Sequence, residues 1–337
     1  MKKLYFISFF IFLLFINLFS QTKIDSLETH LKEAVGNKKI EILNDLSHLY
    51  RNNGAYEKSI EYGKQALELS EKEDNKPEMA NASTNIGLSN YYLGNYNKAI
   101  EFHQQALELF EAIGDKSRKA NSLSNIGIAY DDLGNYEIAL EHSIKSLKIR
   151  EEIEDDRGIA SSLNNIGIIY WNLNDLEKAL EYYFRSLEIK EKLGNKKSVA
   201  NTLSNIGILY DELKNYDKAL KYQRKSLKIR EEIEDKFGIA ASLNNIGYVY
   251  KCLDNPKNAL DYYAKALKGY EEIQNKWGFA NTLKNIGNIY TEQENYDKAF
   301  DYLERSLTEA RKIKAKELIK ENYYAFSNLF IEKDDYE

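Results

Sequence analysis

The sequence predicts an all-α protein built as a solenoid of antiparallel helix pairs, and three observations support this class. The chain of 337 residues holds only 2 Pro among long runs rich in Leu, Ile, Lys and Glu, which favour helix. The triplet Asn-Ile-Gly occurs six times at a spacing of 40 residues, from the copy at Asn85 to the copy at Asn285. Ala and Tyr residues keep the same phase along the chain. A repeat of this length indicates one array of stacked repeats and not several separate cores.

Each repeat is predicted to contain two helices, which we call helix A and helix B. Positions in helix A are numbered so that the Gly of Asn-Ile-Gly is position 8 and the Ala seven residues earlier is position 1. Positions 1, 4, 7, 8, 11 and 14 fall at helical spacing and are expected to face the core, as in Ala160, Leu163, Ile166, Gly167, Tyr170 and Leu173. The corresponding stripe of helix B is Ala179, Leu180, Tyr183, Leu187 and Ile189. Gly167 and Ala179 are small where the two helices must approach closely.

Polar residues and glycine mark the ends of these helices. Inside a repeat, Gly134 is expected to take the left-handed conformation that ends helix A, and Asn135 is expected to cap helix B. At the junction between repeats, an Asp or Asn stands where it can cap the next helix A: Asp115, Asp155, Asn195, Asp235 and Asn275.

The first 20 residues have the layout of a secretory signal peptide. Lys2 and Lys3 precede an apolar stretch over residues 4–19, and Ser20 precedes a polar segment. We therefore expect export and cleavage near Ser20, which places the protein in the periplasm or outside the cell. A membrane anchor formed by residues 4–19 is the alternative, although sixteen helical residues rise only ~24 Å against a hydrocarbon core of ~30 Å. No other membrane span is expected.

The repeat resembles the tetratricopeptide repeat, in its 40-residue variety. The matching features are Ile126-Gly127, Tyr130 three residues later, Ala139 at the start of helix B and Ser146 seven residues beyond it. The chain departs from the family pattern where the Trp near the start of helix A is Leu or Ser and where the Pro that closes helix B is Glu. The resemblance implies a right-handed superhelical solenoid. The expected organisation is a signal peptide at 1–20, an N-terminal capping helix at 21–36, seven repeats of about 40 residues over 37–314, and the first helix of an eighth, incomplete repeat at 315–337.

Composition and motif spacing argue against an enzyme, a metal site, a bound cofactor and a nucleic-acid partner. The net charge is -6 and the pI is 5.6, whereas a sequence-independent nucleic-acid binder needs a basic face. The single Cys252 cannot form an internal disulfide, and the four His residues show no paired spacing typical of metal ligands. The charges of helix B are interpreted as surface i, i+4 partners, for example Lys148 with Glu152 and Arg150 with Glu154.

The side of helix A opposite the expected core stripe carries positions 2, 5, 6, 9, 12 and 13. Arrays of the tetratricopeptide family turn this side toward a concave groove, so the resemblance implies a peptide-binding site here. Position 6 is Asn in every full copy, and a ladder of carboxamides can bond the backbone of an extended peptide. The alternatives are that duplication copied the Asn with its surroundings or that the Asn bonds within the array. The ladder consists of Asn85, Asn125, Asn165, Asn205, Asn245 and Asn285.

Two further rows lie on the same side of helix A. Position 9 is apolar in Leu88, Ile128, Ile168, Ile208 and Tyr248, which suits either a binding groove or packing between neighbouring A helices. Positions 12 and 13 vary most from copy to copy, so we expect them to carry specificity. The candidates at position 12 are Tyr91, Asp131, Trp171 and Asp211. The acids in this row favour a neutral or basic partner.

These features together predict an exported, non-enzymatic scaffold that binds a protein or peptide segment in its concave groove. The alternative is the extracytoplasmic sensor region of a bacterial signal-transduction protein, a histidine kinase or a transcriptional regulator, truncated before its membrane helix and output domain. The sequence does not identify the partner.

Overall fold

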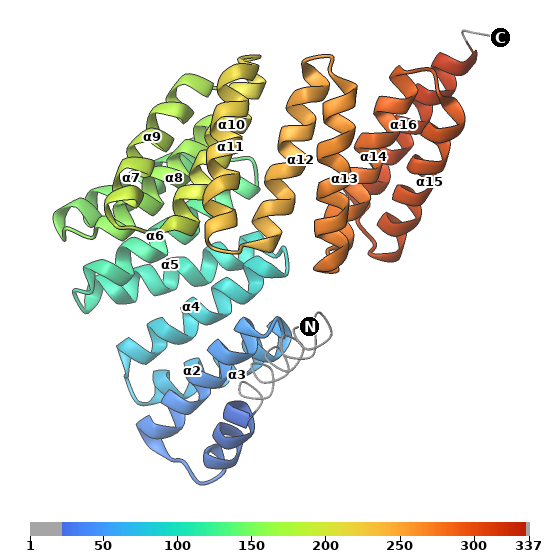
Figure 1. Cartoon of the computed structure of the whole chain (residues 1–337). Helices are drawn as coiled ribbons and strands as arrows, with labels where there is room; N and C mark the ends of the chain where they lie inside the picture. The colour runs from blue at the N-terminus through green and yellow to red at the C-terminus, as the bar shows by residue number, and fades with distance from the viewer. Residues whose placement is uncertain (1–21, 335–337) are drawn as a thin grey trace. The chain divides into compact units, whose positions relative to one another are not determined.

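The computed structural model describes residues 22–334, and every element with described bounds is an α-helix (Figure 1). The chain divides into two compact parts, an N-terminal block that ends at Leu173 and a C-terminal block that begins at Asn174, and each is described by itself. The N-terminal block contains a helical segment over residues 22–31, then α2 (Gly36–Asn52), α3 (Tyr56–Lys72), α4 (Lys76–Tyr92), α5 (Tyr96–Ala112), α6 (Lys116–Asp132), α7 (Tyr136–Glu152) and α8 (Asp156–Asn172). The predicted signal peptide at 1–20 lies outside the described residues.

The C-terminal block contains α9 (Leu176–Lys192), α10 (Lys196–Glu212), α11 (Tyr216–Glu232), α12 (Lys236–Cys252), α13 (Pro256–Glu272), α14 (Lys276–Glu292), α15 (Tyr296–Lys312) and α16 (Lys316–Asp334). Even-numbered helices from α2 onward are the A helices and odd-numbered helices are the B helices. Within each block, consecutive helices pack as neighbours, and successive A helices also contact one another (Figure 1). The predicted all-α class of stacked helix pairs is therefore confirmed. No helix within residues 22–334 is long and apolar enough to cross a membrane.

Side-chain caps begin the A helices as predicted. The Oδ1 atoms of Asp115, Asp155, Asn195, Asp235 and Asn275 accept the backbone N–H three residues later, at 2.9, 3.0, 3.1, 3.1 and 2.6 Å. Gly134 ends α6 with φ of 76°, which confirms its left-handed conformation. The prediction for Asn135 was wrong, because its side chain makes no capping bond to α7. Asn215 and Asn295 do cap their helices in the equivalent place.

The Gly at position 8 is the point where helix A meets helix B. A methyl group on Gly247 would lie 2.8 Å from Cδ1 of the Tyr263 ring, and one on Gly127 would lie 2.7 Å from Oγ of Ser143. Both distances are shorter than a carbon atom tolerates, so only Gly allows the two helices to approach this closely. The predicted close approach is confirmed.

Helix A is buried on two sides, whereas the sequence pattern predicts a single core stripe. Positions 3 and 10 are also buried, as in Ser122 and Ala129, because helix A packs against neighbouring A helices as well as against B helices. Position 14 was wrongly assigned to the core. Leu133 and Leu173 are 37% and 39% exposed, since each stands at the C-cap after helix A has ended.

Tyrosine at position 11 stacks on helix B of its own repeat. The ring centroids of Tyr210 and Tyr222 are 5.5 Å apart with planes inclined by 11°, and the Lys218 ammonium lies 4.9 Å from the Tyr210 centroid. The same stacking joins Tyr50 to Tyr62, Tyr250 to Tyr262 and Tyr290 to Tyr302. Aromatic pairs of this kind contribute about 0.5–1.5 kcal/mol beyond their buried area, so they reinforce the contact made at position 8.

Arg150, which the sequence predicts at the surface, is buried, and so is its counterpart Arg230. Residues 145–155 recur unchanged at 225–235, and this segment brings Arg150 and Arg230 to equivalent sites, each 6% exposed. Arg150 donates to the carbonyl of Gly158 at 2.7 Å and to Oδ1 of Asn121 at 2.8 Å, which ties α7 to the helices on either side. The expected pairing of Arg150 with Glu154 was therefore wrong.

Burial lowers the pKa of both guanidinium groups, which nevertheless stay charged. Glu152, which was predicted to pair with Lys148, instead forms an ion pair with Lys116 of α6 at 3.2 Å. Both side chains of that pair are largely exposed, so it adds little to stability.

A glycine faces each buried arginine, and its substitution tests the close packing. In Gly238→Ala the new methyl group would lie 2.6 Å from Cδ of Arg230. We expect the free energy of unfolding to fall by about 1–3 kcal/mol, because overpacking outweighs the gain in helix propensity. Thermal unfolding followed by circular dichroism measures the change. The control is Ser198→Ala at the equivalent position of α10, where we expect a change within about 0.5 kcal/mol. A stabilised Gly238→Ala protein would contradict the prediction.

Candidate peptide-binding groove

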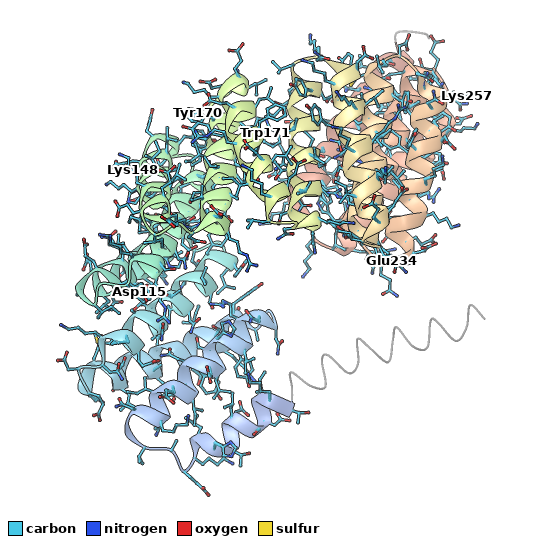
Figure 2. All side chains as sticks on the ribbon, turned by 60° about the vertical axis from the view of Figure 1, so that its left-hand side comes forward. Asp115, Lys148, Tyr170, Trp171, Glu234 and Lys257 are labelled. Carbon is cyan, nitrogen blue, oxygen red and sulfur yellow. The ribbon has the colours of Figure 1, made fainter. Side chains whose placement is uncertain are left out.

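The candidate site, which we call the groove face, is the side of helix A that carries positions 2, 5, 6, 9, 12 and 13. In the N-terminal block it belongs to α4, α6 and α8, and in the C-terminal block to α10, α12 and α14. Within the predicted site Asn85 is buried and Tyr248 is 46% exposed, while the others are half-buried. The half-buried members are Leu88, Tyr91, Asn125, Ile128, Asp131, Asn165, Ile168, Trp171, Asn205, Ile208, Asp211, Asn245 and Asn285. Trp171 lies close to the C-terminal end of α8, beside Tyr170 (Figure 2).

The position-6 amides reach back to position 5 of the preceding helix A. Nδ2 of Asn165 donates to Oγ of Ser124 at 3.3 Å, and Nδ2 of Asn245 donates to Oγ of Ser204 at 3.4 Å. Asn285 repeats the contact with Oδ1 of Asn244 at 3.5 Å. These bonds are long and therefore weak. The side-chain oxygens of Asn165, Asn245 and Asn285 accept no hydrogen bond from the described part of the chain, so each amide keeps an acceptor for a ligand.

Asn85 differs from the later members of the ladder. Its Oδ1 accepts from Nη1 of Arg51 at 2.7 Å, and its Nδ2 donates to the carbonyl of Asn44 at 3.3 Å. Burial lowers the pKa of Arg51, and Asn85 is only 7% exposed. Both polar ends of this amide are thus occupied within the protein, which gives Asn85 a structural role in joining α2 to α4.

A second row of contacts joins position 12 of one repeat to position 13 of the next. The Tyr91 hydroxyl donates to Asp132 at 2.6 Å. Asn172 donates to Asp131 at 2.8 Å, and Lys251 forms an ion pair with Glu292 at 2.7 Å. The sequence prediction treated these positions as variable, whereas in the structure they vary in complementary pairs. The signal was present in the sequence as a donor and an acceptor 41 residues apart.

Asp211 at position 12 does not form such a contact with position 13 of the next repeat. The residue that occupies the partner position is Cys252, and Oδ1 of Asp211 is buried without any hydrogen-bond partner among the described residues. Burial, with a smaller contribution from the charge of Glu212, raises the pKa of Asp211 to about 6. Burial also raises the pKa of the Cys252 thiol, and the nearby Asp211 charge acts in the same direction.

Each block contains a pocket on this face. The pocket of the C-terminal block has a volume of about 340 Å³ and brings together position-6, position-9 and position-12 residues of the predicted site. Its lining consists of Gly207, Ile208, Asp211, Glu212, Gln223, Asn244, Asn245, Tyr248, Val249, Asn281 and Asn285. The pocket of the N-terminal block has a volume of about 660 Å³ and is lined mostly by polar residues, including Asn85, Asn125, Glu41, Asp45 and Arg118.

Leu88 lines a separate depression of about 390 Å³ with Arg51, Asn52, Tyr56 and Tyr92. Residues 22–334 contain no cluster of three or more His, Cys, Asp or Glu side chains arranged to hold a metal ion.

Models of the tetratricopeptide repeat match residues 39–112, 118–192, 198–272 and 279–313, which together make up more than half of the chain. The chain belongs to the tetratricopeptide repeat family. The comparison of this tetratricopeptide protein with curated proteins gives no significant match.

Several solved structures share this tetratricopeptide fold. The apo form of RapI is 22% identical, with 82% of this chain and 99% of that chain covered and a TM-score of 0.67. A Rap protein complexed with competence and sporulation factor is 18% identical, covering 89% of this chain and 81% of that chain, with a TM-score of 0.64. A signal transduction ATPase with a tetratricopeptide repeat sensor from Pyrococcus horikoshii is 20% identical, covering 93% of this chain and 50% of that chain, with a TM-score of 0.66. At these identities the likeness concerns the fold.

The unpaired carboxyl group of Asp211 predicts a pH-dependent effect on stability. The folded protein holds this proton up to a pKa of about 6, above the ordinary value of 3.8, so unfolding releases it between these values. Stability therefore falls as the pH rises through this window and stays lower above it. In Asp211→Asn, which has no carboxyl group to ionise, we expect a higher melting temperature than in the native protein at about pH 7.5 and a smaller difference at about pH 4.5.

Differential scanning calorimetry at both pH values measures the two melting temperatures. The control is Asp254→Asn, which removes the same charge from an exposed turn residue with φ of 52°, a conformation that Asn adopts readily. An Asp211→Asn protein whose difference from the native protein is the same at both pH values would contradict the prediction.

Proposed function

We propose that this tetratricopeptide repeat protein is a non-enzymatic scaffold that binds an extended protein or peptide segment along the groove face of its A helices. The observation that carries the proposal is the pocket of the C-terminal block, where amides at position 6 and apolar side chains at position 9 line one cavity. A peptide needs both kinds of contact, since its backbone requires hydrogen bonds and its side chains require apolar surface.

The amide oxygens of Asn245 and Asn285 accept no bond within the described chain, so they are available to peptide N–H groups. Ile208 and Tyr248 supply apolar and aromatic surface in the same pocket. The amide bonds to the peptide backbone do not depend on the identity of its side chains, which favours recognition of an extended segment. The Rap protein with a similar fold was solved in complex with a factor, and this supports a ligand-binding role for such an array.

The charges around the pocket favour a neutral or basic partner. Asp211 and Glu212 line it, and no Lys or Arg does. The acidic net charge of -6 acts in the same direction over longer distances. The same charge disfavours a nucleic-acid partner, whose phosphates would be repelled.

Export of the scaffold is part of the proposal and rests on the sequence of residues 1–20. Lys2 and Lys3, the apolar stretch over 4–19 and the small Ser20 suit a secretory signal. The partner would then be a periplasmic or extracellular protein. Retention by residues 4–19 as an anchor would place the same array at the outer side of the membrane.

A second candidate function is sensing within a larger signal-transduction protein. The observation that favours it is the similar Pyrococcus horikoshii ATPase, in which a tetratricopeptide repeat array is named as the sensor. A peptide groove serves a sensor as well as a scaffold, so both functions use the same site.

The amide ladder is tested by removing the members that line the pocket. We expect Asn245→Ala combined with Asn285→Ala to weaken the binding of an extended peptide by more than about tenfold, a loss of about 1.4 kcal/mol. The probe is the peptide most enriched on the native protein from a library of random peptides, labelled and titrated by fluorescence polarisation. The melting temperature should change little, because the two amides make only long bonds within the array.

The matched control is Asn85→Ala. It removes an amide whose oxygen and nitrogen both form hydrogen bonds within the protein. We expect this variant to lower the melting temperature clearly, because it leaves the buried Arg51 without its acceptor. A double variant that loses stability as Asn85→Ala does, with unchanged affinity for the peptide, would show that the ladder is structural. Failure of the native protein to enrich any peptide would overturn the proposed function.

A further inference from the structure

The contacts between positions 12 and 13 follow one rule in three places where the structure describes them. Tyr91 meets Asp132, Asn172 meets Asp131, and Lys251 meets Glu292, so one oxygen of each of these three acids has a donor from the neighbouring repeat. Asp211 is an exception, and its Oδ1 is buried with no donor among the described residues. A buried carboxylate oxygen without a donor carries a desolvation cost that a bound ligand can remove.

Cys252, which stands opposite Asp211 in this row, does not take the place of a donor. A thiol is only a weak hydrogen-bond donor, and Oδ1 of Asp211 has no partner among the described residues. We call Asp211, Glu212, Tyr248 and Cys252 the Asp211 cluster, and none of these side chains donates to Oδ1 of Asp211.

Tyr263 of α13 supplies a second, independent sign that the cluster is incomplete. Its side chain is 0% exposed and its hydroxyl has no hydrogen-bond partner among the described residues. Burial raises the pKa of Tyr263, and the charges that raise it further are those of Cys252, Tyr248, Glu292 and Asp211. The Tyr263 ring packs against Gly247, which directly precedes Tyr248 in α12. Two buried polar atoms of this region, Oδ1 of Asp211 and the Tyr263 hydroxyl, thus have no partner among the described residues.

The pocket beside this cluster has the size and charge for a basic side chain. Its volume of about 340 Å³ is within the range of ligand pockets, about 300–1,000 Å³. Asp211 and Glu212 line it without any Lys or Arg, and the nearby Lys251 is held by Glu292 at 2.7 Å. No cation of the described chain thus occupies the place opposite Asp211.

We propose that this pocket binds a Lys or Arg side chain of the peptide partner, with Asp211 as the ion-pair acceptor. This inference rests on the proposed function, because it names the side chain that the peptide groove selects. A cation suits the site better than a neutral donor, since hydrogen bonds between charged groups are about twice as strong as neutral ones. Ile208 and the Tyr248 ring contact the aliphatic stem of such a side chain, and the ring face attracts its charge.

The two kinds of contact divide the recognition between them. Asn245 and Asn285 of the same pocket bond the peptide backbone and accept many sequences. Asp211 then restricts one position of the peptide to Lys or Arg. In the N-terminal block, the equivalent Asp131 already accepts from Asn172, so it selects no cation.

The experiment selects random peptides on the native protein and on Asp211→Asn and sequences the bound populations. On the native protein we expect Lys and Arg to be enriched at one position of the aligned peptides by at least about fivefold. This enrichment is smaller than the effect that a close ion pair at an interface can have on affinity. On Asp211→Asn this preference should vanish, while peptides continue to bind. Asp254→Asn, which removes the same charge from an exposed turn, should keep the preference.

A second variant supplies the donor that the row lacks. Cys252→Asn places at this position the residue that Asn172 provides for Asp131, so its amide should bond Asp211 internally. We expect the variant to lose most of the preference for Lys and Arg and to melt at a higher temperature than the native protein. This outcome distinguishes a vacant acceptor from a general effect of negative charge, because Cys252→Asn leaves the net charge unchanged.

The outcomes separate this inference from the proposed function. Enriched peptides with no preference for Lys or Arg on the native protein would leave the scaffold function standing and overturn the inference. A preference that persists in Asp211→Asn would also overturn it. The absence of any enriched peptide would overturn the proposed function and the inference together.

Discussion

The whole array depends on the contact between helix A and helix B at the Gly of position 8. The residue that faces this Gly varies widely, from Ser143 to Gln223 and Tyr263, yet each approaches so closely that a methyl group would collide with it. The distance between the two helices is therefore set by the Gly and not by the size of its neighbour. Because each repeat contacts only its neighbours, this local constraint fixes the geometry step by step along each block. The groove face inherits its regular spacing from it.

Regular spacing explains why polar contacts across the groove face join residues 41 apart. An amide at position 6 meets position 5 of the preceding repeat, and position 12 meets position 13 of the following one. Neighbouring A helices are thus offset by one residue, so a substitution at one position changes the environment of its partner in the next repeat. Exposed pairs of this kind contribute little individually to stability. Their main consequence is that polar groups on the groove face are occupied in pairs, and a residue without its partner is available to a ligand.

The sequence was sufficient for the repeat, the helix pairs, the caps of the A helices and the small residue at the helix crossing, since all of these follow from local periodicity and capping chemistry. It was insufficient for contacts that depend on the packing of several helices. Arg150 looked like a surface residue because its spacing to Glu154 suits an exposed ion pair, whereas three helices enclose it. Leu173 fitted the apolar stripe, but the helix ends one residue before it. Predicting the hydrogen-bond partners of the Asn ladder would have required the offset between neighbouring A helices. A helical wheel describes one helix and does not contain this offset.

Asp211 shows how such a framework can generate selectivity without a specialised domain. The protein bears the cost of a half-buried carboxyl group whose oxygen has no donor, and this cost is reflected in a pKa raised to about 6. A cationic ligand that satisfies the oxygen removes the cost at the moment of binding, so part of the binding free energy comes from relief of a defect in the free protein. A neutral donor obtains a smaller contribution, because its hydrogen bond to the carboxylate is weaker than that of a cation. In the proposed function, selection at a single repeat therefore needs only one unmatched pair among matched ones, beside the amides of Asn245 and Asn285 that would bond the peptide backbone.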